Sequence, residues 1–141
     1  MAEPRWSKVF CPVDFSEESR AALLAAADLS RRMGAELTLF HAESADSMIQ
    51  AASSPAGQLG DWRREAERLG VVRVTTASAP GQPATAIVET ATQGGFDLIV
   101  MGTHGRTGRR GMLIGSVTES VVRSSRVPVL TVHADWMKKW L

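Results

Sequence analysis

The chain of 141 residues has a single cysteine, Cys11, and no apolar run that approaches the roughly 20 residues of a membrane span. One cysteine excludes an internal disulfide and suits a reducing compartment. The first residues also lack the apolar segment of a signal peptide, because the short run at 9–11 is followed at once by Pro12 and Asp14. We therefore expect a cytoplasmic protein that does not enter a membrane, with Cys11 buried as a structural thiol.

The sequence has little excess of either charge, since its 16 basic and 15 acidic residues leave a formal net charge of +1. That balance argues against nucleic acid as a partner. Locally, however, Arg106, Arg109 and Arg110 lie between Gly102 and Gly115 with no acidic residue among them. A positive cluster in a nearly neutral chain favours a small anion over a polyanion.

Patterns that mark catalytic or metal sites are also missing. His41 and His104 show neither the two-histidine spacing nor the His–Glu spacing that is typical of metal ligands. No Cys–His or Ser–His–Asp arrangement can be argued from spacing, and no general base for a nucleotide γ-phosphate is identifiable. These absences weaken the case for an enzyme more than the case for a binding protein. We expect His41 to be a core or strand-end residue.

Apolar runs alternate with helical patterns along the chain. The runs predict strands at 8–14, 36–42, 71–77, 97–101 and 127–132. Apolar residues three and four apart predict helices around 22–33, 59–69, 84–91 and 117–125. Ser16 is expected to cap the first helix and Gly34 to end it, whereas 43–57 shows no periodicity and predicts a loop. The alternation predicts a parallel sheet with helices on both faces, a single three-layer α/β/α domain over 1–141 with a tail at 134–141.

A long glycine-rich stretch, 102–116, follows the fourth apolar run and precedes the last helical pattern. Glycines at such a junction let the backbone approach a ligand, and the following helix presents unpaired N–H groups and the positive end of its dipole. These are the parts of a phosphate site. The stretch has neither the Gly-Lys-Ser/Thr of a Walker A loop nor the dinucleotide pattern Gly-x-Gly-x-x-Gly. Its own spacing is Gly102-x2-Gly105-x9-Gly115-Ser116.

Three segments far apart in the sequence are expected at one edge of this sheet. In doubly wound sheets, ligands bind beyond the carboxyl ends of the strands, where the strand order reverses. The glycine-rich stretch lies at that edge, and so do 12–14 after the first strand and 41–42 after the second. Asp14 is there either an acceptor for adenine or ribose, or a turn carboxylate. Ser116 begins a capping-box pattern, and the same hydroxyl is also suited to binding phosphate, with Thr118 as a further hydroxyl.

These segments resemble the universal stress protein family in both order and internal spacing. The resemblance is carried by the stretches 9–16, 41–42, 81–83, 97–106, 115–119 and 127–130. It implies the adenine nucleotide alpha hydrolase-like fold, with five strands in the order 3-2-1-4-5 when numbered along the chain, and a homodimer paired through the fifth strand. It also favours the ATP-binding branch of the family, whose glycine spacing is present, with Mg²⁺ or Mn²⁺ bridging the phosphates.

The resemblance further implies a role for each matching residue of the site. The adenine base would lie by Pro12, Asp14 and Ala42, with Val13 also in the site. The ribose and phosphates would lie by Met101, Gly102, Gly105, Arg106, Gly115, Ser116, Val117 and Thr118. For Arg106 the alternative is that it faces solvent.

The resemblance favours ATP binding, and the lack of an identifiable catalytic general base argues against hydrolysis as the main activity. Together they favour a regulator whose ATP occupancy is sensed in the stress response. The alternatives are a slow ATPase or phosphotransfer enzyme that uses the same site, and a dimeric interaction module that needs no nucleotide. In the tail, Trp136 and Trp140 are four residues apart, and so are Met137 and Leu141. We expect a short amphipathic helix that docks on its own domain or on a dimer partner; a loose tail or a partner-binding anchor are the alternatives.

Overall fold

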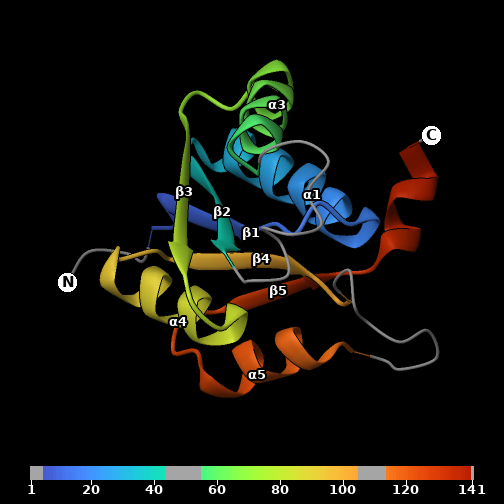
Figure 1. The fold of residues 1–141 in the computed structure, drawn as a ribbon. Helices are drawn as coiled ribbons and strands as arrows, with labels where there is room; N and C mark the ends of the chain where they lie inside the picture. The colour runs from blue at the N-terminus through green and yellow to red at the C-terminus, as the bar shows by residue number, and fades with distance from the viewer. Residues whose placement is uncertain (1–4, 44–54, 105–113, 141) are drawn as a thin grey trace.

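The computed structural model describes residues 5–43, 55–104 and 114–140. Five parallel strands form one sheet in the order β3-β2-β1-β4-β5, which confirms the expected architecture (Figure 1). The strands are β1 (Lys8–Pro12), β2 (Glu36–Glu43), β3 (Val74–Pro80), β4 (Leu98–Gly102) and β5 (Val129–Val132). The inner strands are apolar and buried along almost their whole length, because helices cover both of their faces.

Two pairs of helices cover the two faces of the sheet (Figure 1). The first pair, α1 (Glu17–Met33) and α3 (Pro55–Arg68), packs on what we call the α1 face. The second pair, α4 (Pro83–Gln93) and α5 (Ser116–Ser124), packs on the opposite α4 face. In the described part of the chain, none of these helices is long and apolar enough to cross a membrane.

Each face of the sheet has its own hydrophobic cluster. Along β1, Val9 and Cys11 belong to the cluster of the α1 face and Phe10 to that of the α4 face, as the two-residue period of a strand requires. Burial raises the pKa of the Cys11 thiol to about 12. The expected buried, structural thiol is thereby confirmed.

The predicted ends of several elements are wrong by a few residues. β1 ends at Pro12, and β3 runs from Val74 to Pro80 instead of over 71–77. The turn that ends α3 reaches as far as Val71, whose N–H donates to the carbonyl of Ala66, so the strand can begin only after it. Helix α3 begins at Pro55, inside the predicted loop, because a proline in the first turn needs no partner for an N–H group.

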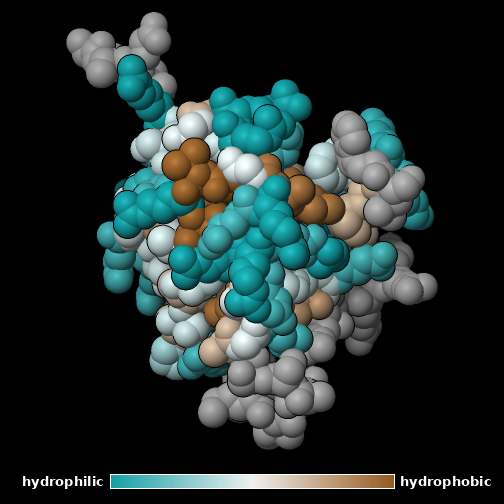
Figure 2. Space-filling model, turned by 90° about the horizontal axis from the view of Figure 1, so that it is seen from above, coloured by the Kyte–Doolittle hydropathy of each residue, from teal (hydrophilic) through white to brown (hydrophobic). Residues whose placement is uncertain are grey.

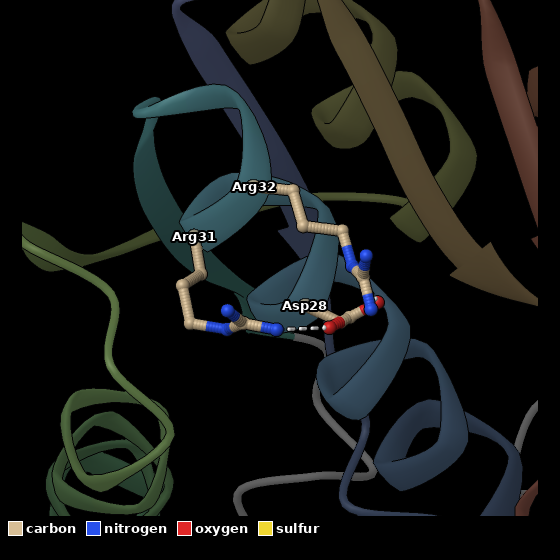
Figure 3. Close-up of polar contacts among 3 residues, drawn as sticks. All are labelled: Asp28, Arg31 and Arg32. Atoms are coloured by element: carbon tan, nitrogen blue, oxygen red, sulfur yellow. Dashed lines mark hydrogen bonds and ion pairs between the residues drawn. The ribbon is translucent and has the colours of Figure 1, made fainter.

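Helix α1 is capped as predicted: the side chain of Ser16 accepts a hydrogen bond from the first turn, and Gly34 ends the helix with φ +65°. Asp28 accepts hydrogen bonds from Arg31 and Arg32 in the last turn of the helix (Figure 3). Desolvation raises the pKa of Asp28, but the two arginines outweigh it and hold that pKa below its ordinary value.

Seen from above, the surface of the molecule is mostly hydrophilic, with apolar side chains in limited areas (Figure 2).

The carboxyl-terminal residues form a 3-10 helix, η1 (Ala134–Trp140), that lies against α1. Met137 is buried in the cluster of the α1 face, and Trp136 packs against that cluster while partly exposed. The tail therefore docks on its own domain, as one of the expected arrangements had it, although with 3-10 geometry.

Candidate functional site

The strand order reverses between β1 and β4. The chain leaves β1 for the α1 face and leaves β4 for the α4 face, so the two connections diverge where ligands bind in doubly wound sheets. The carboxyl ends of β1, β2 and β4 bring the described parts of the predicted segments to this one edge. Gly105 and Arg106, which were also predicted, lie outside the described residues.

Three residues of the predicted site share the α4 face: Pro12 and Ala42 from the predicted adenine side, and Met101, which was predicted beside the ribose and phosphates. Met101 belongs to the cluster of that face, and Ala42 packs against it. Pro12 stands between Cys11 and Val13, which both belong to the cluster of the α1 face, so the alternation along the chain directs Pro12 to the α4 face. Pro12 and Met101 are buried and Ala42 is half-buried. We call these three apolar strand ends the floor of the edge; an apolar surface there would suit the flat face of a ring.

A tight turn joins β1 to α1. Its first residue, Val13, donates its N–H to the carbonyl of Phe40 at 2.7 Å. In Asp14, Oδ1 accepts the N–H of Ser16 at 3.0 Å, so this carboxylate does serve the turn. Phe15 has φ +64° and is the only non-glycine residue with a positive φ in the described part of the chain. That conformation costs roughly 1–3 kcal/mol and persists only where packing imposes it.

Gly102 ends β4 directly beside the first turn of α1. A Cβ atom at this position would lie 2.8 Å from the Cβ and 2.9 Å from the backbone carbon and oxygen of Glu18. Packed atoms do not approach so closely, so only glycine lets α1 and β4 meet here. This packing role could not be recognised from the spacing of the glycines.

The first turn of α5 differs from its prediction. Gly115 has the extended conformation of an N-cap, and its carbonyl accepts the N–H of Glu119 at 2.9 Å. The expectation that Ser116 caps the helix is therefore wrong: Ser116 is the first helical residue, and its side chain is exposed. Its hydroxyl stands next to the N–H groups of the first turn, which have no partner within the helix. The N–H of Gly115 donates to the carbonyl of Thr103 at 2.6 Å, so the start of α5 is tied to the residue that follows β4.

Thr118 ties this turn to the sheet. Its hydroxyl donates to the carbonyl of Gly102 at 2.7 Å, and the residue is 2% exposed. The hydroxyl hydrogen is thus engaged inside the protein, so Thr118 positions α5 rather than offering that hydrogen to a ligand. Its neighbour Val117 is half-buried against the cluster of the α4 face.

A groove of about 610 Å³ between α4 and α5 begins at the same edge. Pro83 and Ala84 of α4 line one side; Ser116 and Val117 of α5 line the other. Of the predicted site residues that the structure describes, only these two from α5 reach it. Sequence reasoning missed the groove, since its one local signal is the spacing of serines along α5.

His41 was expected in the core or at a strand end, and it lies in both places. It is 5% exposed near the end of β2, and its Nδ1 donates to the carbonyl of Val13 at 2.9 Å. Nδ1 of His104 lies 3.2 Å from the hydroxyl of Thr103. Among the described residues, no group of three or more His, Cys, Asp or Glu side chains is placed to hold a metal ion.

Residues 5–133 match the universal stress protein family. A universal stress protein of Methanocaldococcus jannaschii is 34% identical over 143 aligned positions, which cover 92% of this chain and 84% of the relative. The chain also matches universal stress proteins of Mycobacterium tuberculosis and Mycobacterium bovis, of which it spans about half the length, 47%.

Two solved structures show the same fold. The hypothetical protein MJ0577, also from Methanocaldococcus jannaschii, superimposes with a TM-score of 0.81 at 28% identity, over 92% of this chain and 97% of the other. A universal stress protein crystallised in complex with cAMP superimposes with a TM-score of 0.76 at 26% identity, over 93% of this chain and 99% of the other.

Proposed function

The chain belongs to the universal stress protein family, and we propose that it is a cytoplasmic regulator of the stress response that binds ATP at the carboxyl edge of its sheet. The observation that carries this proposal is the pairing of two unlike surfaces at one edge. An apolar floor made of strand ends lies beside a helix start whose N–H groups have no partner within the helix.

The floor formed by Pro12, Ala42 and Met101 would receive the adenine ring. Its side chains are apolar and come from three adjacent strands of the sheet. The Asp14 carboxylate, at the same edge, would accept a hydrogen bond from the base or the ribose. The relative that was crystallised with cAMP supports this assignment, because cAMP combines the same base with a phosphate.

The first turn of α5 would receive the phosphates. Backbone N–H groups and the helix dipole favour anions at such a terminus, and the exposed hydroxyl of Ser116 adds a donor. Gly105 and Arg106 would complete this side from the loop outside the described residues. Because the described residues hold no cluster of metal ligands, a bridging Mg²⁺ or Mn²⁺ would be held mainly by phosphate oxygens. The ion would neutralise phosphate charge.

The geometry suggests how occupancy would be sensed. The turn at Asp14 leads into α1 on one face of the sheet, and Ser116 begins α5 on the other. ATP that contacts both would tie the two connections together. Nucleotide would then stabilise one relative arrangement of the two helical layers, which is a state that a partner can recognise.

Isothermal titration with ATP and Mg²⁺ tests the proposal, with Gly115→Val as the variant. Gly115 is buried with φ −75° and ψ 162°, a backbone conformation that valine adopts readily, and the added side chain is intended to block the phosphate side. Circular dichroism checks that the variant folds. Gly60→Val is the matched control, because a Cβ there meets only the Arg64 side chain at 3.7 Å. We expect binding by the wild type and the control and none by Gly115→Val. Equal binding by all three would contradict the proposed site.

We further propose a homodimer formed through β5. This strand lies at the edge of the sheet, and Leu130 in it and Val122 in the neighbouring α5 are 40% and 46% exposed. An unpaired strand edge with apolar side chains is suited to pairing with a second copy. Light scattering after size exclusion should show a dimer that Leu130→Asp converts to a monomer. The control Val72→Asp, at another exposed apolar residue, should stay dimeric. A dimer that persists in Leu130→Asp would exclude β5 as the interface.

A further inference from the structure

We propose that His41 is a positioning residue for the adenine side of this site. It would do so without touching the nucleotide, because it points to the α1 face whereas its neighbour Ala42 packs on the α4 face. The inference rests on the proposed nucleotide function. It assigns to His41 the task of fixing the turn that carries Asp14.

The first argument is the way in which Val13 is held. The sheet ladder of β1 ends at Pro12, and the N–H of Val13 still reaches the carbonyl of Phe40 at 2.7 Å. The carbonyl of Val13 accepts from Nδ1 of His41 at 2.9 Å. Both polar groups of this residue are therefore tied to β2, one by backbone and one by the histidine. Asp14 is the next residue, so the direction of its backbone is set by these two bonds.

The second argument is the packing on the other side of Asp14. The ring of Phe15 lies 5.0 Å from the ring of His41, and it meets the Trp62 ring of α3 edge-on at 5.3 Å. Phe15 holds the positive φ, which a packed environment must impose. His41 thus contacts both neighbours of Asp14, by a hydrogen bond before it and by ring packing after it.

The third argument is what the histidine leaves unsatisfied. A carbonyl oxygen can only accept, so Nδ1 carries the hydrogen and Nε2 is an acceptor. Nε2 is buried and has no hydrogen-bond partner among the described residues. Leu37 and Leu39 fill the preceding positions on the same face without any polar atom to satisfy. A buried, unpaired acceptor is unfavourable, so the gain from histidine here is the directed bond to Val13.

Three variants separate the bond from the ring and from general stability. His41→Phe keeps an aromatic ring against Phe15 and removes the donor. His41→Asn places an amide donor where Nδ1 stands and removes the ring. Thr38→Val is the control: it removes another side-chain hydrogen bond of β2, the part-buried 2.7 Å bond to Thr75, on the α4 side and away from the turn. The readouts are the dissociation constants for ATP and for inorganic tripolyphosphate, which lacks the base.

We expect His41→Phe to weaken ATP binding by about tenfold, as the loss of one directed contact would, and to leave tripolyphosphate binding unchanged. His41→Asn should bind ATP more tightly than His41→Phe, and Thr38→Val should bind both ligands like the wild type. If His41→Phe binds ATP with the same affinity as the wild type, or loses affinity equally for both ligands, the positioning role is overturned while the proposed function stands. If the wild-type protein binds tripolyphosphate but shows no preference for ATP, both are overturned.

Discussion

The two sides of the candidate site are built from different parts of the fold. The adenine side consists of strand ends that continue the hydrophobic core, so Pro12 and Met101 are buried there. The phosphate side consists of a helix start, where the hydroxyl of Ser116 is exposed and the first N–H groups have no partner within the helix. At the proposed site, recognition of the shape of the base would thus come from rigid core packing, whereas recognition of the anion would come from groups that the fold leaves without partners within the helix.

The two sides are joined at one residue. Gly102 packs against the first turn of α1, and its carbonyl accepts the hydroxyl of Thr118 in the first turn of α5. A change at this junction should disturb both sides at once, whereas a change on either side should act locally.

The largest loss of stability is expected for Gly102→Ala. The added Cβ would meet backbone atoms of Glu18 at 2.9 Å, which cannot move aside without shifting α1. We expect the free energy of unfolding to fall by roughly 2–3 kcal/mol, as overpacking of a core does. Urea unfolding followed by circular dichroism measures it. The control Gly60→Ala should not lose stability, because it adds the same methyl group where only the Arg64 side chain is near. Equal unfolding midpoints for the two variants would refute the close approach.

The second effect is a pH dependence of stability caused by Cys11, which is buried in the cluster of the α1 face, next to Pro12 in β1. The pKa of the Cys11 thiol is raised by burial from 9.0 to about 12. The folded state therefore keeps a proton that the unfolded state loses above pH 9, so stability is full below pH 9 and falls as pH rises toward 12. The slope is half-developed at pH 9 and approaches about 1.4 kcal/mol per pH unit above pH 10. Urea unfolding at pH 8, 9 and 10 measures it. In Cys11→Ala this part of the slope should vanish, and an unchanged slope would show that other groups cause it.

The smallest effects separate two hydroxyl groups of α5. Thr118→Val removes the buried bond to Gly102 and leaves that carbonyl without its donor, so it should destabilise the protein by about 1–2 kcal/mol. Ser116→Ala removes an exposed hydroxyl and should change stability by less than about 0.5 kcal/mol, yet it should weaken ATP binding. Thermal unfolding with and without ATP compares the two variants. A larger loss of stability in Ser116→Ala than in Thr118→Val would reverse the roles given to them.

The parts of the fold that could be predicted are those with strong local signals. The inner strands are continuous apolar runs because both of their faces are buried, and their positions came out within a residue or two. The cap at Ser16 was predicted because a serine before acidic residues is a local arrangement. The start of β3 was misplaced because Val71 is apolar for a different reason: it packs beneath the turn that ends α3.

In the candidate site, too, features with local sequence signals could be predicted and features that depend on tertiary packing could not. That the segments at Pro12, Ala42 and Gly102 meet follows from the alternation of strands and helices, which a sequence displays. The cap of α5 was misjudged because Ser116 fits a capping pattern, while Gly115 already takes the extended conformation that a cap requires. The contact of Gly102 with Glu18 joins residues that are adjacent only in space.

The sequence by itself therefore determined the class of the fold and the edge at which a site is expected, and the resemblance to a family added the adenine and phosphate chemistry. The fold class and the edge follow from periodicity and turn residues, which are properties of short stretches. Only the tertiary structure decided that the Thr118 hydroxyl is bonded inside the protein, why residue 102 must be glycine, and how His41 contacts the turn before Asp14. Those are matters of distance and direction between separate elements, and packing sets them only once the sheet and its helices have assembled.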